Sequence, residues 1–134
     1  MAHAKATIGT TNYAVSITAG HHELNADEGP ELGGQDTGPA PYDILCAALC
    51  ACTSITLRMY AERKAWPLNA LHVDVRFTRD DQGGAIARSL ALEGPLDETQ
   101  RAKLADIAER TPVTLTLKQG LPIVTTLVAA SPAS

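Results

Sequence analysis

A long uncharged segment, Ile44 to Leu57, constrains the fold of this chain more than any other feature. Shortly before it stand Pro41, which suits the first position of a helix, and Asp43, whose charge favours the positive end of the helix dipole. The segment therefore predicts a helix that begins at Pro41 and runs to about Lys64, because a proline follows soon afterwards. A helix without a polar face has to be buried. We expect it at the centre of the fold.

Short strands and one further helix are predicted around this central helix. Asp97 and Gln100 form the N-cap signature of a helix that ends near Arg110. The pattern of apolar and polar residues predicts strands over residues 13–18, 21–26, 71–78, 85–92, 113–117 and 123–128. We expect residues 131–134 to form a frayed tail. This order predicts a single α+β domain over residues 1–134, with helices packed on antiparallel sheets.

Composition and charge exclude several classes of protein. With 45% hydrophobic and 19% charged residues, the chain of 134 residues is expected to be globular. A net charge of -4 without a Lys/Arg cluster argues against nucleic acid and anionic membranes as partners. The uncharged segment is shorter than the roughly 20 residues of a membrane span, and the N-terminus has no secretory pattern. The three cysteines all lie in one predicted helix, so we expect no disulfide framework and a cytoplasmic location.

The central helix also carries a long ordered motif. Its segments are Pro41-Tyr42-Asp43, Leu45, Ala47-Ala48-Leu49, Ala51-Cys52-Thr53-Ser54, Thr56-Leu57-Arg58-Met59-Tyr60-Ala61 and Lys64-Ala65-Trp66. The motif resembles the signature helix of OsmC/Ohr proteins, in the OsmC-like branch whose helix ends in Lys-x-Trp. The resemblance covers roughly the whole chain. It implies antiparallel sheets around a buried central helix, an intertwined homodimer and a role in the stress response.

Cys52 matches the reactive cysteine of that family. The resemblance implies that its sulfur attacks an organic hydroperoxide and becomes a sulfenic acid, which a second cysteine captures as a disulfide. The alternative is that Cys52 is a small apolar residue of a buried helix, as free cysteines often are. By helical phase Cys46 and Cys50 are expected to be core residues that cannot reach Cys52.

The chain departs from the family pattern at three places around Cys52. Thr111 stands where the resemblance places the second cysteine. No arginine precedes Arg58, although the family's peroxidases use an N-terminal one. Tyr42 stands in place of their glutamate, with Asp43 one residue on. Asp43 and the partner subunit's Arg58 are therefore candidates for the missing carboxylate and cation. Neither a metal site nor a cofactor site is predicted, since no Cys/His spacing fits zinc and no phosphate-binding pattern occurs.

Two functions compete at this stage. The first is a thiol-dependent organic hydroperoxidase of weak or altered activity that acts through Cys52 and an external thiol reductant. The second is a non-catalytic dimer of the same fold, which binds a small lipophilic molecule or a partner protein.

Overall fold

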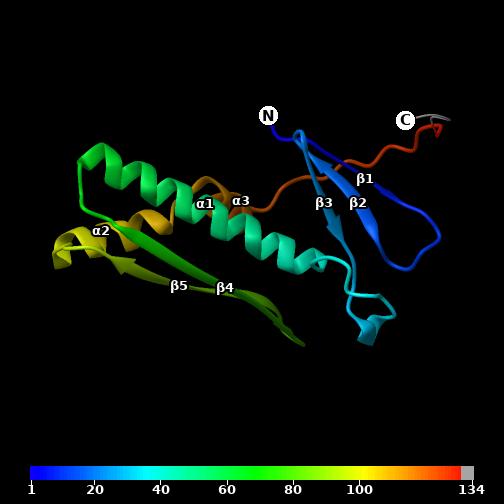
Figure 1. Cartoon of the computed structure of the whole chain (residues 1–134), viewed down its shortest axis with the longest axis horizontal. Coiled ribbons are helices and arrows are strands. Elements are labelled where there is room, and N and C mark those ends of the chain that lie inside the picture. Colours follow the sequence, from blue (N-terminus) through cyan, green and yellow to red (C-terminus); the bar gives the residue numbers. More distant parts are fainter. Residues whose placement is uncertain (131–134) are drawn as a thin grey trace.

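The uncharged segment lies inside one long helix, α1 (Pro41–Lys64), in the computed structural model, which describes residues 1–130 (Figure 1). Pro41 occupies the first turn, and the carboxylate of Asp43 accepts the backbone N–H of Ala40 at 3.1 Å. At the other end Ala65 adopts a left-handed conformation, with φ of 55°, and stops the helix. Both predicted ends of the central helix are confirmed.

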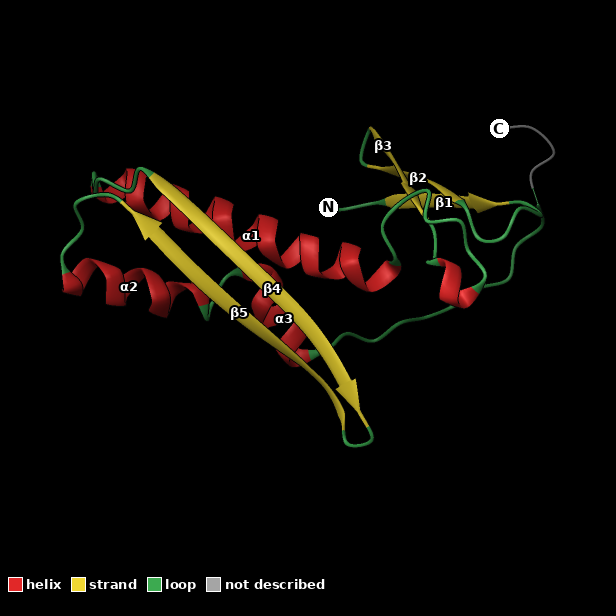
Figure 2. Ribbon diagram, turned by 60° about the horizontal axis from the view of Figure 1, so that its bottom comes forward, coloured by secondary structure: helices red, strands yellow, loops and turns green. Residues whose placement is uncertain are grey.

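Two separate antiparallel sheets accompany α1. The hairpin of β4 (Ala70–Asp80) and β5 (Gly83–Glu93) crosses α1 and packs along it (Figure 2). The second sheet contains β1 (Ala4–Ile8), β2 (Val15–Ala19) and β3 (His22–Ala26), and lies beyond the N-terminal end of α1 (Figure 1). Four of these strands, β2, β3, β4 and β5, were predicted from the pattern of apolar and polar residues. β1 was missed, although Ala4, Ala6 and Ile8 alternate with polar residues; two of its three apolar residues are alanines, which are a weak strand signal.

The C-terminal third is helical where strands were predicted. The predicted capping box is confirmed at α2 (Glu98–Ala108), since Gln100 N–H donates to Asp97 Oδ1 at 2.7 Å. The strand over residues 113–117 is wrong: this segment belongs to α3 (Pro112–Gln119), which begins at a proline and packs against α1. The strand over 123–128 is also wrong, because residues 120–130 form neither helix nor strand. The expected tail lies outside the described residues. Before α1 there is also a short turn of 3-10 helix, η1 (Pro30–Leu32).

The hydrophobic core lies between α1, the hairpin and α2. Its buried members are Leu57, Ala61, Leu68, Leu96, Leu104 and Ala108. Only one side of α1 takes part, since the buried residues of this helix are Leu49, Thr53, Leu57 and Ala61. On its opposite side Ile55 is 55% exposed and Met59 is 57% exposed. A single chain therefore covers one face of the apolar helix and leaves another bare.

By length and composition α1 could also cross a membrane, a property shared by the core helices of globular domains.

Asp27 organises the loop that leads from β3 into α1. Its side chain is buried and accepts three backbone N–H groups, from Tyr13 (3.1 Å), Glu28 (2.7 Å) and Thr37 (3.1 Å). The hydroxyl of Thr37 donates a fourth hydrogen bond at 2.6 Å. This hydroxyl, followed by the three N–H groups, holds the pKa of Asp27 well below its usual range, against the opposing effect of burial.

We expect Asp27→Asn to lower the melting temperature at pH 7, because an amide nitrogen would face donors that need an acceptor. A depressed carboxyl pKa stabilises the folded state above the unfolded value of about 4, and this contribution is lost as pH falls through the folded pKa. The difference between the two proteins should therefore shrink below about pH 4. Asp81→Asn is the control, since Asp81 is exposed and accepts no hydrogen bond within residues 1–130. Equal melting curves for wild type and Asp27→Asn at pH 7 would contradict this role.

Candidate active site

Cys52 and the N-terminus of α3 form the centre of the candidate site. The side chain of Cys52 is partly exposed, and its sulfur accepts the backbone N–H of Val113 at 3.5 Å. The only other polar contact of this sulfur within residues 1–130 is the hydroxyl of Thr56, one helical turn further along α1, at 4.0 Å. Two segments far apart in the sequence are thus joined through one thiol.

The first turn of α3 explains why this N–H is free to point at sulfur. The first N–H groups of a helix have no partner within the helix, and a side chain at the N-cap usually accepts one of them. Here the N-cap is Thr111, but its buried hydroxyl bonds Thr114 Oγ1 at 2.6 Å instead. The sulfur of Cys52 takes the place of that cap. The sulfur thus lies at the N-terminus of α3, where the helix carries partial positive charge.

The other two cysteines are placed differently. All three are free thiols. The thiol of Cys50 points at the hairpin, where it donates to the carbonyl oxygen of Val73 at 3.8 Å. No polar contact of Cys46 occurs within residues 1–130. Neither of them meets a helix N-terminus.

The two other candidate residues do not meet Cys52 within the chain. Asp43 caps the start of α1 through Ala40, and nine residues of helix, or about 14 Å, separate it from Cys52. Arg58 forms no hydrogen bond or ion pair within residues 1–130. Tyr42, which stands in place of the family glutamate, stacks on Phe77 with ring centroids 4.5 Å apart and accepts a hydrogen bond from Arg79.

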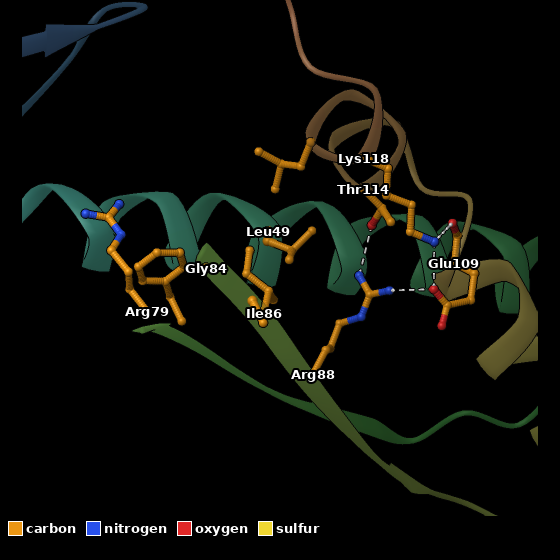
Figure 3. Close-up of a pocket in the computed structure, with 11 residues that line it drawn as sticks. Leu49, Arg79, Gly84, Ile86, Arg88, Glu109, Thr114 and Lys118 are labelled. Atoms are coloured by element: carbon orange, nitrogen blue, oxygen red, sulfur yellow. Dashed lines mark hydrogen bonds and ion pairs between the residues drawn. The ribbon is translucent and has the colours of Figure 1, made fainter. Parts of the chain in front are cut away.

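A cavity of about 640 Å³ opens next to this site, between the hairpin and the two helices α1 and α3. Figure 3 shows Arg79 at one end and a charged cluster of Arg88, Glu109 and Lys118 at the other. Apolar side chains lie between the two ends, namely Leu49, Phe77, Ile86 and Leu117. Cys52 does not line this cavity, so the thiol and the cavity are neighbouring but distinct features.

Arg88 was missed in the sequence, although the signal was present. It falls in step with Ile86, Leu90 and Leu92, on the face of β5 that turns inward. A cation at an inward position of an amphipathic strand has to find partners there. Its side chain is only 11% exposed. Within residues 1–130, no three His, Cys, Asp or Glu side chains come together as metal ligands would.

Comparisons with known proteins agree with the fold. Residues 34–126 match the family described as OsmC-like protein. An OsmC-like protein from Mycoplasma pneumoniae is 21% identical with a TM-score of 0.76, over 88% of this chain and 87% of that one. An organic hydroperoxide resistance protein OsmC from Legionella pneumophila is 21% identical with a TM-score of 0.64, over 88% and 89% of the two chains.

A third structure is a putative organic hydroperoxide resistance protein from Vibrio cholerae with captopril bound in one of its active sites. It is 22% identical with a TM-score of 0.62, over 88% of this chain and 84% of that one. A search of curated protein sequences found no significant match. The family match spans well over half of the chain, and the structural matches share its α+β arrangement of antiparallel sheets and helices. The chain belongs to the OsmC-like protein family.

Proposed function

We propose that the protein is a thiol-dependent organic hydroperoxidase that acts through Cys52. The observation that carries the proposal is the N–H of Val113 at 3.5 Å from a partly exposed sulfur. The thiolate is the form of cysteine that attacks peroxides, and this sulfur lies at the partially positive end of a helix. The names of two similar structures, which are organic hydroperoxide resistance proteins, support the class of substrate.

The proposed cycle uses one protein thiol and two molecules of an external thiol. The Cys52 thiolate attacks the terminal oxygen of a hydroperoxide, ROOH; the O–O bond breaks, sulfur becomes a sulfenic acid and the alcohol ROH leaves. A small thiol then displaces water to form a mixed disulfide, and a second one releases Cys52 as a thiol together with the oxidised small disulfide. Small thiols are available in the cytoplasm, where we place the protein.

We further propose that two copies assemble through the bare face of α1. Four exposed residues with helical spacing form this face: Ala47, Ala51, Ile55 and Met59. The side chains of this face are small in the half near Cys46 and large in the half near Tyr60. In an antiparallel partner helix, the small side chains of one copy would therefore face the large side chains of the other. Cys52 borders the face, three residues before Ile55. A partner placed there would cover the thiol and complete a site for an apolar peroxide.

The alternative function is a binding protein without turnover. The cavity favours it, because apolar side chains with cations at both ends suit a small lipophilic molecule, and Cys52 is not part of the lining. A protein of this kind would bind such a molecule equally well after Cys52→Ser and would show no turnover of peroxide in either form.

Cys52 should be oxidised before the other two cysteines, because its sulfur alone meets a helix N-terminus among the described residues. Limited treatment with cumene hydroperoxide followed by peptide mass spectrometry measures the order. Cys52→Ser should reduce peroxide consumption to the background rate. Oxidation of Cys46 or Cys50 ahead of Cys52 would refute the assignment.

Turnover should require added thiol and should fade in excess peroxide, because Thr111 cannot capture the sulfenic acid and further oxidation is generally irreversible. Thr111 lies two residues before Val113, so Thr111→Cys would place a second thiol beside the site. We expect this variant to resist peroxide and to form a disulfide with Cys52, at a cost of about 1 kcal/mol for the lost hydroxyl contact with Thr114.

Thr111→Ser is the matched control, since it keeps the hydroxyl and adds no thiol. It should remain as sensitive to peroxide as the wild type. Equal inactivation of Thr111→Cys and Thr111→Ser would show that position 111 has no part in resolving the sulfenic acid.

The bare face of α1 gives a test of assembly. At micromolar concentration the protein should sediment at twice its chain mass of 14.1 kDa. Ala51→Glu should weaken the dimer on the order of 100-fold, because a carboxylate would be buried without a partner. Ala102→Glu, the same change at an exposed position of α2, should leave it intact. A stable folded monomer in the wild type would remove the dimer and the interfacial site together.

A further inference from the structure

A nearly buried arginine of β5 joins the three helices beside the candidate site. The side chain of Arg88 is only 11% exposed. Its Nη1 donates to Thr114 Oγ1 at 2.9 Å (Figure 3) and to Thr53 Oγ1 at 3.0 Å. Its Nη2 donates to the carbonyl oxygen of Ala108 at 2.7 Å. One guanidinium therefore connects α1, the end of α2 and the first turn of α3.

The positions of these acceptors relate Arg88 to the thiol. Thr53 directly follows Cys52, and Thr114 directly follows Val113, whose N–H is bonded to the sulfur. One nitrogen of Arg88 thus bonds the residue after Cys52 and the residue after Val113, which are the two partners of that hydrogen bond. The same contact engages the hydroxyl of Thr114 that bonds Thr111. The N-cap hydroxyl is thereby kept away from the N–H of Val113, which remains available to the sulfur.

The surrounding charges keep the guanidinium in place. Glu109 Oε2 lies 3.7 Å from Arg88 Nη2 and 3.1 Å from Lys118 Nζ. The hydrogen bond and charge of Lys118, with a smaller effect of Arg88, hold the pKa of Glu109 below its usual value. Glu109 therefore stays charged near neutrality and ties the end of α2 to the end of α3. No charged side chain bonds the sulfur of Cys52 within residues 1–130.

We propose that Arg88 is a positioning residue for Cys52: it fixes the first turn of α3 on α1, so that the N–H of Val113 meets the sulfur. Arg88 does not bond the sulfur of Cys52 within residues 1–130. It acts through the geometry of Thr53 and Thr114, and a change at Arg88 alters the reactivity of Cys52 through that geometry. The proposal rests on Cys52 being the reactive thiol, but it can be measured without any peroxide.

The test is the rate of Cys52 alkylation by iodoacetamide as a function of pH, in a Cys46→Ser/Cys50→Ser background so that one thiol reacts. In Arg88→Met the pH midpoint of the rate should rise by about one unit, which lowers the rate at pH 7 up to about tenfold. Arg88→Lys should recover part of the shift, since it keeps the charge but not three directed donors. Arg76→Met is the control, because Arg76 lies on the same hairpin and exposed Asp74 is its only polar partner within residues 1–130.

A loss of packing alone would lower the melting temperature without moving this midpoint. An unchanged midpoint in Arg88→Met would overturn the proposal. If that variant does not fold, Thr114→Val removes one acceptor while Arg88 remains, and it too should raise the midpoint. An unchanged midpoint in Thr114→Val would also overturn the proposal. Peroxide turnover is measured separately. A midpoint that depends on Arg88 in a protein without turnover would leave the positioning role intact and reject the peroxidase.

Discussion

The rest of this structure depends on one helix, α1, which has too little polar surface to be exposed to water on any side. α1 has to bury apolar residues on more sides than a domain of 134 residues can cover. The hairpin and α2 cover one side, where Leu57 and Ala61 are completely buried, and α3 packs further along. The side around Ile55 stays open. Cys52 lies on the border between the covered and the open side because the chain cannot cover the whole of α1.

The junction between α1 and α3 is polar because three threonines meet there. Thr53, Thr111 and Thr114 are all buried, and their hydroxyls need partners. Arg88 supplies donors to two of them, Thr53 donates to the carbonyl oxygen of Leu49, and Thr111 pairs with Thr114. No buried side-chain nitrogen or oxygen lacks a partner within residues 1–130. A fully paired network of this kind fixes one relative position of two helices, which apolar contacts alone would leave less defined.

Local signals predicted the elements that local interactions determine. Pro41 and the capping box at Asp97 predicted the starts of α1 and α2, and the alternation of β4 and β5 predicted the hairpin. The segment 113–117 was misread because Val113, Leu115 and Leu117 alternate with threonines as strand residues do. Contact with α1 and the proline at the first turn outweighed that preference, as tertiary packing often does. The reactive role of Cys52 comes from the family motif and stays a prediction. The contact of its sulfur with the N–H of Val113 could not be predicted, because a backbone donor has no signature in sequence.

The absence of an arginine before Arg58 affects the charge that the sulfur of Cys52 can meet. A helix N-terminus offers a fixed partial charge of about half a unit at the sulfur, whereas an arginine would bring a full and movable charge that could also bind the peroxide. In the proposed arrangement Arg88 contributes through position, and the backbone of α3 supplies the partial charge at the sulfur. Within residues 1–130 the sulfur of Cys52 has no cationic partner that could also contact a substrate. With the proposed function, we expect selectivity for a peroxide to come from the apolar surface that borders Cys52. The open face of α1 would then serve both the proposed site and the proposed dimer.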